Sequence, residues 1–198
     1  MGGVGSPTRP YKGRTAEEGR EERRRRLLAA GLELWGDNGW ASVTMRGVCA
    51  HAGLNDRYFY ESFPDVEALL LAVFDESLAG LVTVMEGKLA AAPREPSARI
   101  RFAMSAFIRA LSADPRRARI GLAEPAGSPA LEQRRRDTYH LFARMAREDF
   151  GAPDDLAILF ALGGVGELVI SWLSGALPVD AEQLVDRATA LVVATISD

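Results

Sequence analysis

The chain has 198 residues, 47% of them hydrophobic and 26% charged, a composition typical of a globular protein of one or two domains. Its net charge of −3 argues against a protein whose whole surface binds nucleic acid, because such surfaces are usually basic. The single cysteine, Cys49, excludes an intramolecular disulfide, and with two histidines it leaves no structural zinc site of the usual kind.

The N-terminal residues 1–15 are polar and interrupted by glycine and proline, without the apolar run of a secretory signal, so we expect a flexible arm. The stretch 156–179 is long enough to cross a membrane, and Glu167 is its only charge. Its glycines and acidic flanks favour a helix buried against other helices instead. We therefore expect a cytoplasmic protein without a membrane partner.

Helix signals run along the rest of the chain. Thr15 and Glu18 form a capping-box pattern, which predicts a first helix that begins after Thr15 and ends at Gly39. The apolar residues of this helix at helical spacing are Leu28, Leu32 and Trp35.

Two short helices are predicted next. Thr44 is a good N-cap for a helix over 45–52, and Gly53 can adopt the left-handed conformation that ends it. Asn55 can cap a third helix over 56–62, which the following proline stops.

A long fourth helix is predicted to start at Asp65 and to end before Pro93. Five further helices follow, with predicted caps at Ser97, Asp114, Ser128, Asp154 and Asp180. The prediction is therefore all-α, with about nine helices: the arm 1–15, a first helical domain over 16–64 and a second helical domain over 65–198.

The second and third helices form a compact helix-turn-helix between Thr44 and Ser62. Helical spacing places Phe59 and Phe63 against the Leu28/Trp35 face of the first helix and leaves Arg57, Tyr58 and Glu61 on the other side. An arginine can recognise guanine and tyrosine hydroxyls can reach phosphates. From these residues alone, a solvated face of an ordinary helix pair remains an alternative.

The segments from Leu27 to Trp35 and from Gly39 to Phe63 resemble the DNA-binding domain of the TetR family of transcriptional regulators. The resemblance rests on the frame of Gly39, Val43-Thr44, Val48 and Ala52-Gly53, on the aromatic end of the recognition helix, and on the acidic Glu67-Ala-Leu-Leu that follows. It implies an all-helical repressor that binds a palindromic DNA operator as a homodimer, releases it when a small lipophilic effector binds, and needs no cofactor or metal.

The resemblance also implies which residues contact DNA. Thr44 is expected to touch a phosphate and Arg46 to lie near the groove, while Arg57, and with it Asp56 and Tyr58, reads bases and Tyr60 contacts the backbone. The full set is Thr44, Arg46, Asn55, Asp56, Arg57, Tyr58, Tyr60 and Ser62. Val66 stands where relatives often have a phosphate-binding lysine, and the arm residues Arg9, Lys12 and Arg14 are expected to compensate.

In such a regulator the second domain binds the effector and forms the dimer. The expected effector pocket is apolar and consists of Phe102, Phe107, Tyr139, Phe142, Met145 and Trp172, with Met104 beside them. The expected dimer surface comes from the last two helices and consists of Gly163, Gly164, Glu167, Leu184, Ala188 and Leu191.

Three observations bound this interpretation. No nucleophile–base pair and no phosphate-binding loop supports an enzyme, and Asp137 and His140 lack further metal ligands. The run Arg23–Arg26 follows four glutamates, and pairs such as Glu21–Arg25 favour a solvated helical face over phosphate contact. Residues 1–63 hold ten Lys and Arg against eight Asp and Glu, so the acidic surplus lies in the second domain.

An alternative function stays open: a helix-turn-helix architectural or interaction protein without a small-molecule effector. A solidly packed second domain would favour it, whereas an apolar cavity there would favour a ligand-responsive regulator.

Overall fold

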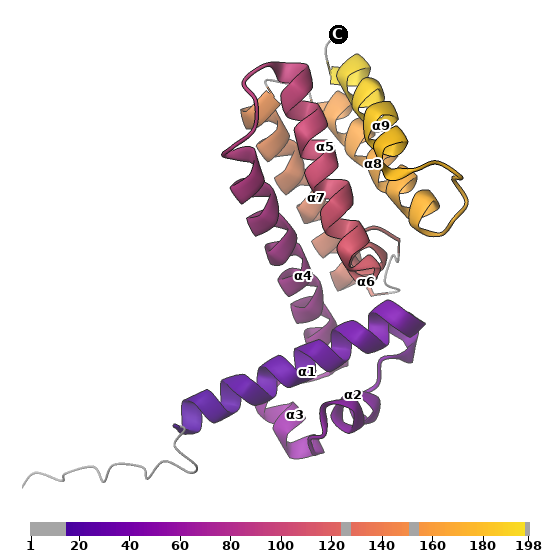
Figure 1. Cartoon of the computed structure of the whole chain (residues 1–198). Coiled ribbons are helices and arrows are strands. Elements are labelled where there is room, and N and C mark those ends of the chain that lie inside the picture. Colours follow the sequence, from indigo (N-terminus) through magenta and orange to yellow (C-terminus); the bar gives the residue numbers. More distant parts are fainter. Residues whose placement is uncertain (1–14, 124–127, 151–154, 197–198) are drawn as a thin grey trace, which may run out of the picture. The chain divides into compact units, whose positions relative to one another are not determined.

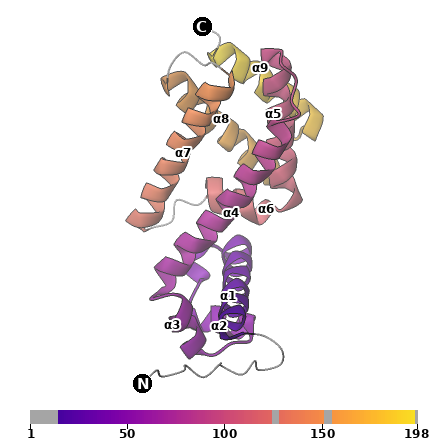
Figure 2. The ribbon, with the colours of Figure 1, turned by 90° about the vertical axis from the view of Figure 1, so that its left-hand side faces the viewer.

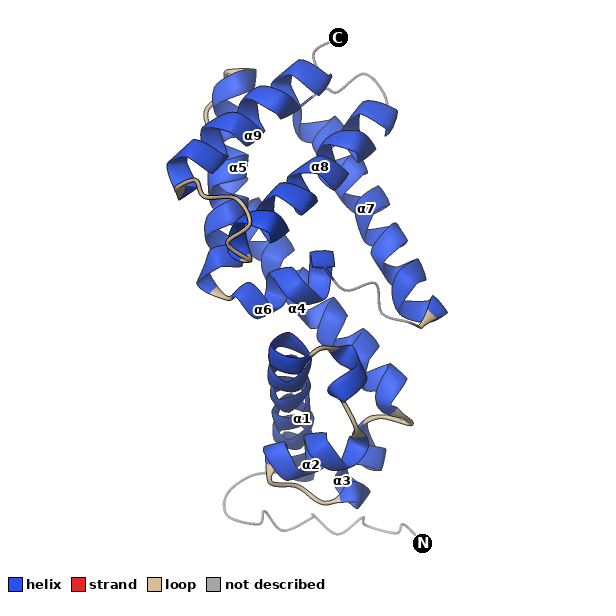
Figure 3. Cartoon of the chain, turned by 90° about the vertical axis from the view of Figure 1, so that its right-hand side faces the viewer, coloured by secondary structure: helices blue, strands red, loops and turns tan. Residues whose placement is uncertain are grey.

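The computed structural model describes residues 15–123, 128–150 and 155–196, and within these ranges the protein is helical without a strand (Figures 1 and 3). The described helices are α1 (Ala16–Asn38), α2 (Met45–Ala52), α3 (Asp56–Ser62), α4 (Val66–Leu89), α5 (Pro96–Ala113), α6 (Pro115–Ala118), α7 (Pro129–Phe150), α8 (Asp155–Leu173) and α9 (Ala181–Ile196), with short turns Trp40–Ser42 and Arg119–Ala123. The predicted all-α fold is confirmed. The arm residues 1–14 and the expected cap Asp154 lie outside the described residues.

Contacts divide the chain into two compact units, Met1–Val73 and Phe74–Asp198. The division falls inside α4, nine residues beyond the boundary predicted after residue 64, so this helix contributes a turn or two to the first unit and the rest to the second.

The predicted caps of the first unit are present. Thr15 and Glu18 exchange both hydrogen bonds of the capping box, at 2.7 and 3.1 Å. The Thr44 hydroxyl accepts the Gly47 N–H at 3.1 Å, and Asn55 accepts the Tyr58 N–H at 3.3 Å. These bonds start α2 and α3 by satisfying backbone donors that a helix leaves unpaired.

Gly53 ends α2 at φ 61° and ψ 40°, the left-handed conformation that favours glycine. This residue makes the turn between α2 and α3 and so fixes how the two helices follow each other (Figure 2).

The core of the first unit lies where α1 packs against α2 and α3. Phe59 and Phe63 are 0% and 3% exposed and their ring centroids lie 5.9 Å apart. The side of α1 that faces them differs from the predicted one, because Leu27 and Ala30 are buried with Trp35 while Leu28 and Leu32 are only half-buried. The predicted stripe was therefore wrong by about one residue along the helix.

The arginine run of α1 holds this unit together, which corrects the prediction of a solvated face. The Arg23 guanidinium lies 4.4 Å from the Tyr58 ring centroid and 3.5 Å from the Glu61 carboxylate. Arg24 donates to the Ser62 carbonyl at 3.4 Å, and Arg26 donates to the Ala52 carbonyl. Arg25 pairs instead with the carboxylate of Glu22 within α1.

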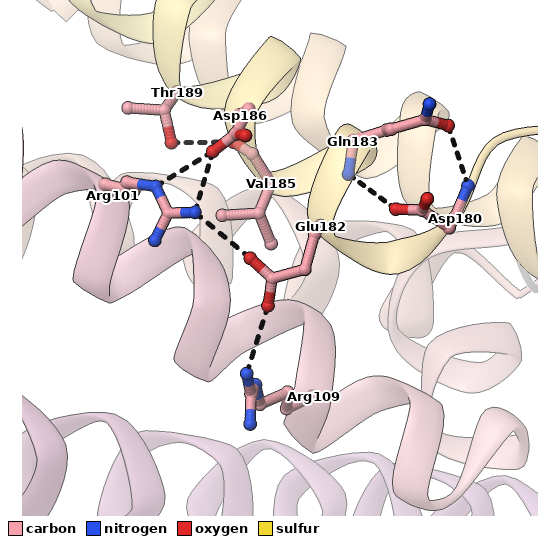
Figure 4. A network of polar contacts seen from close by, with 8 residues as sticks. All are labelled: Arg101, Arg109, Asp180, Glu182, Gln183, Val185, Asp186 and Thr189. Atoms are coloured by element: carbon pink, nitrogen blue, oxygen red, sulfur yellow. Dashed lines mark hydrogen bonds and ion pairs between the residues drawn. The ribbon is translucent and has the colours of Figure 1, made fainter.

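In the second unit, α5 and α9 pack side by side, and ion pairs line their contact (Figures 1 and 4). Arg101 donates to Asp186 at 2.8 Å and to Glu182 at 3.0 Å, and Arg109 reaches the second oxygen of Glu182 at 3.2 Å. The predicted cap Asp180 accepts the Gln183 N–H at 2.8 Å and starts α9.

One predicted cap of this unit was wrong. Glu95, and not Ser97, starts α5, because its carboxylate accepts the backbone N–H groups of Ser97 and Ala98 and Pro96 occupies the first helical position. These backbone hydrogen bonds lower the pKa of Glu95 from its usual value.

Two helices, α4 and α8, are long and apolar enough to cross a membrane by length and composition alone. Each buries part of its apolar surface in the chain, for example Leu69 and Phe74 of α4 and Ile158 and Val169 of α8. Buried helices of soluble proteins pass the same test, so a membrane span does not follow from it.

Candidate functional site

The exposed side of α3 carries polar and charged side chains. Asp56, Arg57, Tyr60 and Glu61 are all exposed, whereas Phe59 between them is buried. The Arg57 side chain is 82% exposed and donates to the Glu61 carboxylate at 3.0 Å. An ion pair this exposed is weak, so the guanidinium is free to exchange Glu61 for another acceptor at little cost.

Two residues predicted to contact DNA have other roles in the chain. Tyr58 is half-buried, because the Arg23 guanidinium stacks on its ring. Ser62 is half-buried, and its carbonyl accepts from Arg24. Tyr60, in contrast, is 59% exposed, and its ring rests edge-on against Phe59 with 5.6 Å between the centroids.

The start of α2 presents the remaining predicted residues. Thr44 and Arg46 are both exposed there, in the first turn of the helix, while Val48 and Cys49 on its other side are buried. Backbone N–H groups at a helix N-terminus and an arginine in the same turn suit a phosphate. Burial, and then the negative charge of Asp56, raise the pKa of the Cys49 thiol, so this cysteine is a core residue and no reactive group.

These side chains form an exposed polar surface on two helices. On α3 it includes the hydrogen-bonding Arg57 and the exposed Tyr60, and on α2 it includes the helix start with Thr44 and Arg46. Such a pair of helices can place α3 in the DNA major groove while α2 contacts the backbone.

The second unit contains an apolar cavity of about 180 Å³ that is partly open to solvent. It runs along α4 from Phe74 to Leu89, about 23 Å at 1.5 Å per helical residue, and along α7 from Thr138 to Phe150, about 18 Å. Its lining includes Leu78, Leu81, Met85, Ile100, Met104, Phe107, Leu111, Leu122, Tyr139, Phe142, Met145, Leu162 and Val165.

Four of the six predicted pocket residues line this cavity: Phe107, Tyr139, Phe142 and Met145. Phe102 does not, because it lies two residues after the lining Ile100 and so on another side of α5. Trp172 does not either, because it packs against Val169 and Leu184 and its indole N–H donates to the Val179 carbonyl at 2.9 Å. The prediction was wrong at these two positions, and it missed the contribution of α4.

The residues predicted for the dimer surface fall into two groups. Gly163, Gly164, Glu167 and Leu191 are exposed. Leu184 and Ala188 are 3% and 1% exposed inside the chain, and Leu184 shares one core cluster with Val165 and Val169, so their prediction as partner contacts was wrong. Leu156 and Phe160, which were not predicted, are 80% and 76% exposed on the same side of α8 as the glycines.

Comparison with known proteins identifies the class. Residues 27–73 match the family model described as bacterial regulatory proteins, tetR family. The HTH-type transcriptional regulator EthR of Mycolicibacterium smegmatis is 26% identical over 129 residues, 65% of this chain and 59% of EthR. The match thus spans less than two thirds of that relative. The part of the chain that holds the helix-turn-helix thus matches the TetR family.

Solved structures agree with this fold. FadR of Bacillus subtilis, solved in complex with stearoyl-CoA, has a TM-score of 0.75 at 18% identity, with 87% of this chain and 98% of that chain covered. The fatty acid degradation regulator FadR of Bacillus halodurans has a TM-score of 0.74 at 17% identity, with 86% and 94% covered. At these identities the likeness is one of fold.

Proposed function

We propose that this chain is a ligand-responsive transcriptional repressor that binds a palindromic operator as a homodimer and leaves it when a small lipophilic effector binds. The DNA contacts come from Thr44, Arg46, Arg57 and Tyr60, with Asn55 and Asp56 at the start of α3. The two recognition helices of a dimer enter successive major grooves about 34–36 Å apart. In this proposal the arm and the domain over 16–64 bind DNA, and the domain over 65–198 binds the effector and forms the dimer.

The single observation that carries the effector half of the proposal is the apolar cavity in the second unit. A volume of about 180 Å³ spread over about 18 to 23 Å suits one aliphatic chain better than a broad ring system. FadR of Bacillus subtilis, which shares the fold, was solved with stearoyl-CoA, a ligand with a long aliphatic chain.

The proposed mechanism is a shift between conformations. Helix α4 lines the cavity and continues into the unit that holds α3. An effector that binds one arrangement of α4 better than another changes the population able to bind DNA, and a difference of about 1–3 kcal/mol per site is enough. The competing function is that of an architectural protein without an effector. A cavity that no ligand can enter would favour this function.

Arg57→Ala tests the DNA half of the proposal. We expect the operator affinity to fall by about 1–3 kcal/mol, and the preference at the contacted base pair to relax, because a direct arginine–base contact is lost. Gel-shift titrations on a footprinted operator and on variants of each base pair measure both effects. Arg25→Ala, which removes an exposed arginine of α1, is the matched control. Unchanged base preference in Arg57→Ala contradicts the assignment of this residue.

Ala161→Phe tests the effector half, because it adds a ring to the cavity wall. We expect operator binding to be retained and the concentration of dodecanoate that releases the operator to rise tenfold or more, since the added ring occupies the volume of the chain. Ala113→Phe places the same ring on an exposed position of α5 and should leave the response unchanged. If dodecanoate and other aliphatic compounds never release the wild-type protein from its operator, the effector half fails.

A further inference from the structure

The cavity has an arginine in its lining at the end near Ser77. Arg117 of α6 lies with its Nη1 atom 3.0 Å from the point where a Cβ on Gly80 would be. The guanidinium therefore occupies space against α4 that any residue other than glycine would fill. It is the only arginine among the residues that line the described cavity.

A second arginine lies on α7, one turn before the lining residue Thr138. Arg135 lies on α7 between Leu131 and Thr138, on the side of the helix that carries the lining residues Phe142 and Asp149. Its Nε atom is buried and has no hydrogen-bond partner among the described residues. A buried donor left unpaired in this way costs about 1–3 kcal/mol. The chain thus keeps an unpaired guanidinium nitrogen within one helical turn of the cavity.

Among the described residues at the start of α6, arginines outnumber acids. Asp114 accepts from Arg116 at 2.8 Å and 3.3 Å, and Arg117 lies 3.5 Å from the same carboxylate, so one acid serves two arginines. Burial raises the pKa of Asp114, but the hydrogen bonds and charges of Arg116 and Arg117 outweigh this effect and lower it, so the carboxylate stays ionised.

The opposite end of the cavity differs. Asp149 is the acid there, and Arg99 neutralises it at 2.7 Å. Between the two ends the lining is apolar apart from the hydroxyls of Ser77, Thr138 and Tyr139, and the Thr138 hydroxyl is engaged by the Arg134 carbonyl at 2.9 Å. An elongated apolar cavity with a positive surplus at one end fits an elongated ligand with a negative charge at one end.

We propose that the effector is an anionic amphiphile whose carboxylate or phosphate binds Arg117 and Arg135 and whose aliphatic chain extends toward Leu89 and Phe150. The inference rests on the proposed function, since it names the chemistry and the orientation of that effector. The anion supplies the acceptor that the Arg135 Nε lacks.

The test compares ligands of equal chain length in full-length protein. Dodecanoate, dodecyl phosphate and 1-dodecanol are titrated by calorimetry into the wild type, Arg117→Gln, Arg135→Met and the control Arg136→Gln, which removes an exposed arginine of the same helix. We expect the wild type to bind the anions at least tenfold more tightly than the alcohol. Each cavity variant should lose about tenfold of that preference, and Arg136→Gln should keep it. The tighter of the two anions identifies the head group.

Thermal unfolding separates a ligand-binding arginine from a structural one. Arg135→Met keeps an unbranched side chain as far as the position of Nε and removes the unpaired donor, so the unliganded variant should melt at the wild-type temperature or above it. A lower melting temperature, or an anion preference that both cavity variants retain, overturns the proposal. If the alcohol binds as tightly as the anions and also releases the operator, this inference falls while the proposed function stands. If no compound binds, both fail.

Discussion

Phe59→Ala is expected to lower the free energy of unfolding of the first unit by about 3–5 kcal/mol, because it removes a fully buried ring from a small core. The Phe59 ring is 0% exposed and packs against Phe63. Domains as small as this unit bury a smaller share of their surface than larger ones and have little stability in reserve. We therefore expect the DNA-binding unit to melt first, and operator binding to be lost at a temperature where the second unit is still folded.

Tyr60→Ala is the matched control, because it removes the neighbouring aromatic ring, which is 59% exposed. Its melting temperature should change little, while operator affinity falls moderately if the hydroxyl contacts a phosphate. Calorimetric melting of both variants, with gel shifts at a temperature below both transitions, distinguishes the two effects. Equal losses of stability in the two variants would contradict the packing described for α3.

Local signals in the sequence were sufficient to predict the helix-turn-helix. The caps Thr15, Thr44 and Asn55 and the left-handed Gly53 act over a few residues, so their patterns are visible without knowledge of the fold. The same holds for the caps Asp65 and Asp180, which accept backbone N–H groups at 2.8 Å.

Contacts between distant segments were not predictable in the same way. Arg23, Arg24 and Arg26 follow a glutamate-rich turn, and the nearest acids in sequence suggest pairs along one helix. The structure instead directs these arginines to α2 and α3, which lie 26 to 38 residues away in the chain. Nothing in the local pattern distinguishes the two outcomes.

The cavity shows the same limit. Apolar residues of α4, such as Leu81 and Met85, have the spacing of an ordinary core stripe, and only the packing of α5, α7 and α8 around them leaves space in front of them. For the same reason Trp172 was assigned to the pocket, although its indole binds the Val179 carbonyl outside the lining. Composition indicates an apolar interior, but it does not distinguish a filled volume from an empty one.

The surface proposed for the dimer rests on exposed apolar residues that the chain itself leaves uncovered. Leu156 and Phe160 of α8 are 80% and 76% exposed, and Leu191 of the adjacent α9 is 58% exposed. Gly163 lies beside them on α8, and a Cβ placed on it would meet nothing within 4 Å. Only 22% of the apolar 18-residue stretch of α8 is buried inside the chain, so most of this apolar surface is available for contact with a partner. In the homodimer that we propose, a second copy supplies that cover, with small residues where the two helices approach.

Phe160→Asp is therefore expected to convert the dimer to a monomer. A two-fold interface contains each residue twice, so the loss of about 2–3 kcal/mol per buried ring becomes about 4–6 kcal/mol, or a thousandfold or more in the dissociation constant. Sedimentation equilibrium measures this constant, and Val84→Asp, at a 44% exposed position of α4, is the control that should stay dimeric. Because a monomer contacts only one half-site, the variant should also lose affinity for a full operator while it still binds a half-site as the wild-type unit does. A Phe160→Asp protein that remains dimeric would exclude this face of α8 as the interface.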